Sequence, residues 1–166
     1  MNLTELFEMQ RRLDKEIDKK RNNINPQFTK KEITLQRMIA LMVEAGEYIN
    51  EVQSFKYWKQ NKNLVCNKIH EEFADLLHFF ITISYEYGIK PEFTPYINEY
   101  HDINIQFKEL FISIAEMMKD INAINIRKAF EIALGSFLLL GYTYEEMFQA
   151  YFFKNQLNYK RLYTNY

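Results

Sequence analysis

The hydrophobic and polar positions repeat with the period of an α-helix, most clearly between residues 38 and 51. Glu44, Glu47 and Glu51 fall on one face, because residues three and seven apart are neighbours on a helix. The same side carries apolar residues, namely Ile33, Ala40 and Val43. Another face is apolar by the i, i+3, i+4 rule and consists of Met38, Ile39, Met42, Ala45 and Ile49. The pattern predicts a helix that is apolar on two sides, with carboxylates set among the apolar groups.

A second stretch, residues 71–79, repeats this arrangement. Glu72 and Asp75 share a helix face with Leu76, Phe79 and Ile83. Carboxylates held among apolar side chains lose hydration and repel one another, so they must be protonated or matched by positive charge. A divalent cation with oxygen ligands from both helices would supply that charge.

The rest of the chain also reads as helical, with few glycines and prolines and no alternating strand pattern. Thr4 is expected to cap a first helix, and Asn125 a later one that ends before Gly141. Capping boxes at Thr29 and Thr143 mark two further starts. The expected helices cover about 4–22, 30–54, 65–87, a short one from 94, 103–121, 125–140 and 144–161. The prediction is an all-α bundle of about six to seven helices in one domain, 1–166.

Composition narrows the possible functions. The formal net charge of −1 gives no basic field for a nucleic acid polymer. The single cysteine, Cys66, excludes an internal disulfide framework and a Cys-based zinc site. The apolar runs are too short to span a membrane, and the first residues lack a signal-peptide pattern, so an intracellular protein is expected. The high apolar content, 48% of residues, favours a homodimer that shares a helical interface.

The acidic pairs allow three interpretations. The first is that both pairs lie on ordinary solvated helix faces. An all-oxygen site would instead prefer Mg²⁺ or Mn²⁺ over zinc. A diiron site is disfavoured, because neither pair has the His at the fourth place that such bundles use, and His78 lies on a different face from Glu72. We expect His78 to be a hydrogen-bonded core residue, not a metal ligand.

A magnesium site of this kind leaves positions for phosphate oxygens, so positive side chains are expected nearby. Trp58, the only tryptophan, is either a core residue or a stacking surface for a base. The amide of Gln10 is able to read a nucleobase edge. The candidate phosphate partners are Lys56, Lys59, Lys62, Lys154, Lys160 and Arg161.

Taken together, the motifs resemble those of the dimeric dUTPases, which belong with the MazG-like proteins to the all-α NTP pyrophosphatases. The resemblance rests on Glu44-Ala-Gly-Glu47, on residues 55–59 (Phe-Lys-Tyr-Trp-Lys), on Glu71-Glu72-Phe-Ala-Asp75, and on early and late motifs at 10–14 and 150–161. It implies hydrolysis of dUTP, and of dUDP, to dUMP with water attacking a phosphate, in the cytoplasm of a bacterial or phage-infected cell.

The resemblance also implies roles for individual residues. Glu44, Glu47, Glu72 and Asp75 would hold Mg²⁺, and Glu44 would orient or deprotonate the water. The substrate-binding residues would be Gln10, Asp14, Lys56, Trp58, Lys59, His78, Lys154, Asn155, Asn158, Tyr159 and Arg161. The alternatives are a pyrophosphatase of the same superfamily with another base, and a non-catalytic helical interaction module.

Overall fold

The computed structural model describes residues 1–164 and is all-α, as the hydrophobic pattern predicts. Within these residues the helices are α1 (Thr4–Ile24), α2 (Lys30–Val52), α3 (Cys66–Glu86), α4 (Ile103–Lys119), α5 (Ala123–Leu139) and α6 (Tyr144–Tyr163). None of the helices in this part of the chain is long and apolar enough to cross a membrane.

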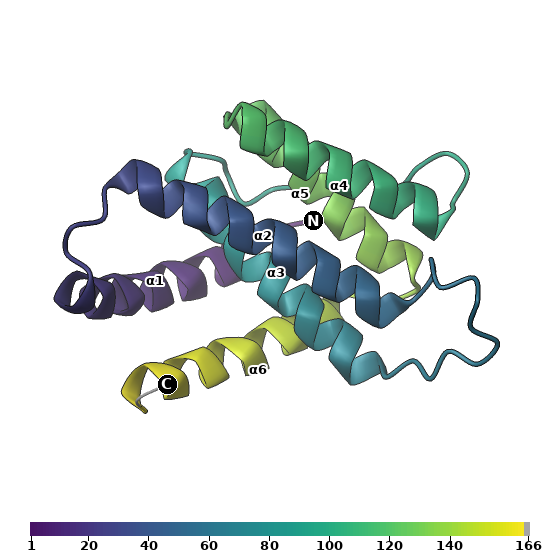
Figure 1. The fold of residues 1–166 in the computed structure, drawn as a ribbon, viewed down its shortest axis with the longest axis horizontal. Coiled ribbons are helices and arrows are strands. Elements are labelled where there is room, and N and C mark those ends of the chain that lie inside the picture. Colours follow the sequence, from purple (N-terminus) through teal and green to yellow (C-terminus); the bar gives the residue numbers. More distant parts are fainter. Residues whose placement is uncertain (165–166) are drawn as a thin grey trace.

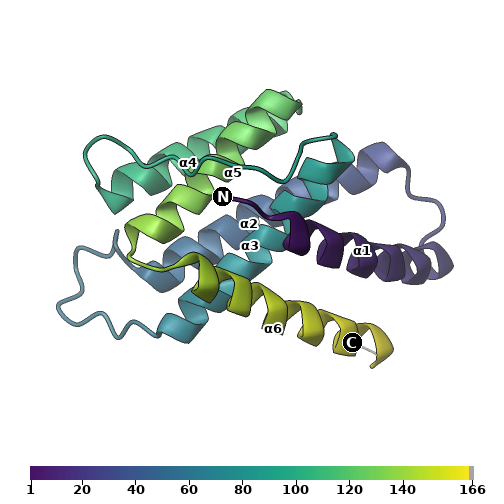
Figure 2. The same ribbon diagram turned by 180° about the vertical axis from the view of Figure 1, so that it is seen from behind.

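The centre of the bundle is α3, which packs against α1, α2, α5 and α6 (Figure 1). Its middle is apolar nearly all round: Phe73, Leu76, Leu77, Phe80 and Ile81 are fully buried. In Figure 1, α2 crosses in front of α3, and the antiparallel pair α4 and α5 lies above them. Seen from behind in Figure 2, α1 and α6 cover the opposite side of α3. The helices that carry the two acidic segments, α2 and α3, are therefore direct neighbours in the bundle.

Local sequence signals set most helix ends. Thr29 Oγ1 accepts a hydrogen bond from the Glu32 amide, and the Glu32 carboxylate accepts one from the Thr29 amide, which confirms the first capping box. Thr143 and Glu146 form the second one at the start of α6. Gly88, with φ +72°, follows the end of α3 in the left-handed conformation expected there.

Two predicted caps are wrong by a few residues. Thr4 is the first residue of α1 and not its cap: the N-cap position is Leu3, and the Asn2 side-chain oxygen just before it accepts hydrogen bonds from the amide and the hydroxyl of Thr4. The cap of α5 is Asn122, not Asn125, because the Asn122 Oδ1 accepts from the amides of Ile124 and Asn125. In both places another short polar residue lies two or three positions earlier and reaches the free amides first.

The short helix predicted from Thr94 is absent, and residues 94–98 are extended. Their main chain bonds to distant groups instead of to itself: the Tyr96 amide donates to Glu131 O at 2.8 Å. The Gln106 Nε2 donates to Tyr96 O at 2.7 Å and to Ile132 O at 2.9 Å. At Gly135 an added Cβ would lie 1.7 Å from Tyr96 O, so this close approach requires glycine.

The buried stripe of α4 is narrower than predicted. Phe107, Leu110 and Ile114 are buried as expected, but Phe111 and Met118 are 36% and 38% exposed, and Met117 is buried instead. On α2, Ile39 is also 49% exposed although it was expected on the core face. These helices lie at the surface of the bundle, so only the stripe that faces α3 or α5 is covered.

Candidate functional site

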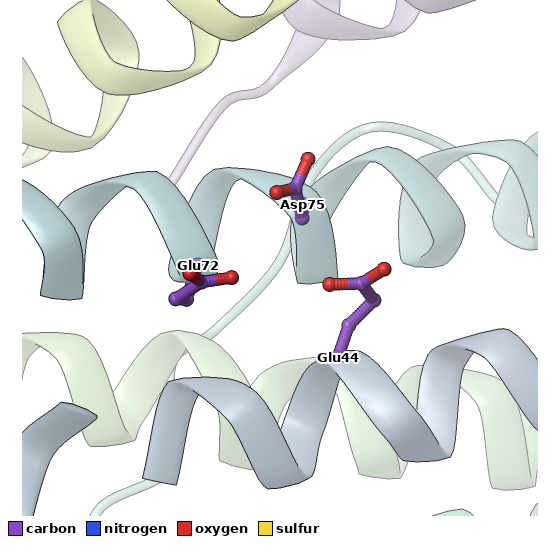
Figure 3. Close-up of side chains that lie close together, drawn as sticks. All are labelled: Glu44, Glu72 and Asp75. Atoms are coloured by element: carbon purple, nitrogen blue, oxygen red, sulfur yellow. The ribbon is translucent and has the colours of Figure 1, made fainter. Parts of the chain in front are cut away.

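Carboxylates from two helices meet between α2 and α3. Glu44 projects from α2 towards Glu72 and Asp75 on α3 (Figure 3). One oxygen from each of the three lies within 4.8 Å of the other two. The i, i+3 spacing places Glu72 and Asp75 on the face of α3 that packs against α2. Such a set of hard oxygen ligands from two rigid helices is suited to a divalent cation such as Mg²⁺ or Mn²⁺.

The fourth predicted carboxylate, Glu47, is exposed and lies outside this group of three. It is nevertheless close enough for its charge to raise the pKa of both Glu44 and Glu72. Glu47 therefore lies on a solvated helix face, as the first interpretation expects, whereas Glu44, Glu72 and Asp75 are partly buried.

Ionisation of the three carboxylates is unfavourable in this position. Burial, and after it the charges of Asp75, Glu47 and Glu72, raise the pKa of Glu44 to about 7, while Lys154 opposes them. Burial is also the main reason that the pKa values of Glu72 and Asp75 lie above their ordinary range. The protein alone does not fully compensate this negative charge, and that is the chemistry expected of a cation site.

Lys154 supplies the nearest positive charge. Its side chain on α6 is 8% exposed, and its Nζ lies 2.5 Å from Asp75 Oδ2 and 2.9 Å from Glu71 Oε1. We predicted Lys154 as a phosphate partner, and the structure places it against the carboxylate cluster. Phosphate oxygens bound at that cluster would lie within its reach.

A cavity of about 410 Å³ opens beside the carboxylates and extends between α1, α2, α3 and α6. Glu44 and Asp75 form part of its wall, so the cavity and the acidic cluster adjoin. Five of the predicted substrate-binding residues also line it, namely Gln10, Asp14, His78, Asn158 and Arg161.

A chain of hydrogen bonds fixes the polar wall of this cavity. Gln10 is buried; its Nε2 donates to Asp14 Oδ1 at 2.9 Å, and its Oε1 accepts from the Tyr151 hydroxyl at 2.5 Å. The Nδ1 of His78 lies 2.5 Å from the same Gln10 oxygen. The pKa of His78 is lowered to about 3, first by burial and then by Lys154, so the imidazole is neutral at pH 7.

A neutral histidine carries one proton, and the Gln10 oxygen draws it to Nδ1. The opposite nitrogen, Nε2, is buried and has no hydrogen-bond partner among residues 1–164. His78 is thus the hydrogen-bonded buried residue that we expected, and this residue of the cavity wall also holds one buried acceptor without a partner.

The remaining predicted residues are more scattered. Asn155 is buried on α6, and Tyr159 is partly buried one helical turn beyond it. Lys56 and Lys59 lie after the end of α2, where they donate to Asn50 O and Gln53 Oε1.

Trp58 lies in the same connecting segment. The alternative that it is a core residue is wrong, because it is 61% exposed and contacts Phe55 and Tyr57 edge-on. Neither Trp58 nor the two lysines is part of the cavity wall.

Several residues of the site were not predicted. Thr82 and Tyr85 both donate to Asp14 Oδ2, at 2.7 and 2.6 Å, and the Tyr151 ring stacks on His78. The signal for the first two was present, since they follow His78 by four and seven positions on one helix face.

Comparison with known proteins gives one finding. A family model described as dUTPase matches residues 2–166. A search of curated proteins returns no match.

Proposed function

The chain belongs to the dUTPase family and is a dUTP diphosphatase, and on that premise we propose how its residues bind and hydrolyse the nucleotide. The reaction depends on Mg²⁺, and dUDP is also hydrolysed to dUMP. One observation carries this proposal: three carboxylates converge within 4.8 Å, and two of them line a cavity whose polar wall is fixed by buried hydrogen bonds.

Glu44, Glu72 and Asp75 hold the metal, and Glu47 completes the negative charge from the next turn of α2. The donor set fits Mg²⁺, because it contains carboxylate oxygens and neither sulfur nor imidazole. When bound, Mg²⁺ would bring phosphate oxygens to the cluster and stabilise the charge on the leaving group.

Glu44 orients the attacking water and accepts its proton. Glu44 is suited to this role because it projects from α2 into the cluster and lines the adjoining cavity, where a water beside a phosphate would lie. Lys154, which is held at the cluster by Asp75 and Glu71, neutralises charge on the phosphates together with Arg161. Asn155, Asn158 and Tyr159 on α6 contact the nucleotide or order this helix, and Lys56 and Lys59 extend the positive charge from the loop after α2.

Gln10 and His78 read the base. The free Nε2 of His78 is an acceptor for the N3–H of uracil, and the second amide hydrogen of Gln10 is a donor for a neighbouring carbonyl oxygen. A base with an unprotonated N3, such as cytosine, would place two acceptors against each other. A stacking role for Trp58 stays a prediction, because its exposed ring lies outside the cavity wall.

Hydrolysis of a panel of deoxynucleoside triphosphates with Mg²⁺ tests this proposal. We expect dUTP to be hydrolysed far faster than the others, and Glu72→Gln to abolish turnover. The control is Glu8→Gln, which removes an exposed carboxylate on α1 that belongs neither to the cluster nor to the cavity wall. Equal rates for all bases would favour the alternative of a MazG-like pyrophosphatase for another nucleotide. No turnover of any nucleotide would favour a non-catalytic interaction module.

A second copy of the chain is the proposed macromolecular partner. On α2, Leu35, Ile39 and Val43 form an i, i+4, i+8 stripe and are 57%, 49% and 51% exposed. The neighbouring α4 exposes Phe111 and Ile112, and the two helices pack side by side at the front of Figure 1. Exposed apolar stripes on adjoining helices are typical of a homodimer interface.

Light scattering after size-exclusion chromatography tests the homodimer. Wild type is expected to elute as a dimer and Ile39→Lys as a folded monomer, with Lys31→Glu as the exposed control on the same helix. A monomeric wild-type protein would refute it.

A further inference from the structure

Asp14 has no free oxygen for a substrate, although it lines the cavity. Its Oδ2 accepts from the hydroxyls of Thr82 and Tyr85, and its Oδ1 accepts from the Gln10 amide. The side chain is buried. A carboxylate in this position can influence a substrate only through the groups that its hydrogen-bond partners present to the cavity.

The first effect of Asp14 is on the orientation of the Gln10 amide. A carboxylate oxygen only accepts, so the group that faces Asp14 Oδ1 at 2.9 Å must be the NH₂ of Gln10. The carbonyl oxygen of Gln10 is then turned to the Tyr151 hydroxyl and to His78. Rotating the amide by 180° would place two acceptors together inside the protein, which is strongly unfavourable.

The second effect follows from the first. With the Gln10 oxygen facing it, His78 Nδ1 must carry the proton, and Nε2 is left as an acceptor. The Tyr151 ring stacks on the imidazole with 4.4 Å between ring centroids, which holds the ring plane in place. The identity of the group at position 14 is thus transmitted over two hydrogen bonds to the unpartnered nitrogen of His78, a residue of the cavity wall.

We propose that Asp14 is a positioning residue for base selectivity, which sets the Gln10 amide and through it the His78 tautomer, so that the cavity accepts an N–H and rejects an unprotonated ring nitrogen. This rests on the proposed base-reading role of His78. Asp14 itself does not touch the nucleotide.

Asp14→Asn is the sharpest perturbation. Two hydroxyl donors, from Thr82 and Tyr85, will keep the Asn oxygen at the Oδ2 position, so its NH₂ faces Gln10. The Gln10 amide then turns its oxygen to this NH₂ and its own NH₂ to His78. Nδ1 of His78 becomes an acceptor, and the proton moves to Nε2. The cavity would then present a donor, which matches the bare N3 of cytosine.

The tautomer is measured on the free protein. We expect long-range ¹⁵N–¹H correlation spectra of histidine-labelled wild type to show His78 protonated at Nδ1 alone, with the signals assigned by their loss in His78→Gln. Asp14→Asn should show the proton on Nε2. An Nε2-protonated or imidazolium His78 in wild type would overturn the proposal whether or not the variant folds. So would an unchanged tautomer in folded Asp14→Asn.

Activity supplies the second measurement. The ratio of kcat/KM for dUTP to that for dCTP should fall about 100-fold in Asp14→Asn, because a mismatched buried donor or acceptor costs at least that much. Glu8→Gln should leave the ratio unchanged. Tyr85→Phe, which removes one hydroxyl but keeps the Gln10 contact, should change it by no more than a few-fold. An equal fall in Tyr85→Phe would assign the effect to loosened packing and refute the proposal.

Separate results would refute the proposed function and the proposed role of Asp14. If wild type hydrolyses none of the nucleotides, the proposed base reading is lost while the tautomer spectra still decide the role of Asp14. If dUTP is hydrolysed selectively and Asp14→Asn keeps both tautomer and ratio, the proposed function stands and the role of Asp14 is refuted.

Discussion

Replacing Glu44 by glutamine should stabilise the metal-free protein above neutral pH. The folded state raises the pKa of Glu44 from 4.5 to about 7, so it binds the proton more tightly than the unfolded chain does. The cost of ionising Glu44 is therefore absent below pH 4.5, grows between pH 4.5 and 7, and is complete above pH 7. A shift of this size would correspond to about 3 kcal/mol for a fully buried group. Because Glu44 is only partly buried, screening reduces it to about 1–2 kcal/mol.

Thermal unfolding followed by circular dichroism measures the effect. At pH 8 in EDTA, Glu44→Gln is expected to melt about 3–6 °C above wild type. At pH 4.5, where Glu44 is already protonated, the two proteins should melt together. Mg²⁺ should raise the Tm of wild type at pH 8 much more than that of the variant, because the variant has lost a ligand. Glu8→Gln should match wild type in every condition. A Glu44→Gln protein that is destabilised at pH 8, or stabilised equally at both pH values, would refute the electrostatic account of the cluster.

Three further changes have defined outcomes in urea unfolding. Lys154→Met should lower the metal-free stability by about 2 kcal/mol, because it leaves two carboxylates without their buried partner, and Mg²⁺ should restore part of the loss; no change would mean that the ion pairs are not formed. Gly135→Ala should cost about 3 kcal/mol or more, since its Cβ would overlap Tyr96 O, and a stability within 0.5 kcal/mol of wild type would contradict that contact. Trp58→Ala should change stability by less than about 0.5 kcal/mol, and a larger loss would show that the indole is packed in solution.

The helices and most of the acidic cluster could be predicted from sequence, because they depend on spacing within single helices. The i, i+3 rule places Glu72 and Asp75 on one face of α3, and the apolar positions beside them indicate that this face is covered. The same rule places Glu47 on one face of α2 with Glu44, so both were predicted as metal ligands. Sequence spacing does not show where a neighbouring helix stops covering the surface, and α3 covers Glu44 more fully than Glu47.

Contacts between distant residues were less predictable. Gln10 and His78 are 68 positions apart, and no local pattern shows that their side chains share a hydrogen bond. The extended segment after Thr94 was mistaken for a helix because its Thr-Pro start is typical of one, whereas its amides bond to α5. Trp58 illustrates the opposite error, since a lone large aromatic residue usually packs inside and this one does not.

The central position of α3 has a consequence for how the sequence can vary. From residue 72 to residue 86 no side chain is exposed, and the segment carries two of the clustered carboxylates, the histidine at the cavity and much of the core. A saturation-mutagenesis map of this protein should therefore show residues 72–86 of α3 as an unbroken block of intolerant positions. The surface helix α4 should instead show tolerated positions recurring every three or four residues. Drift in such a family would be slowest in this segment of α3, which has no outward side.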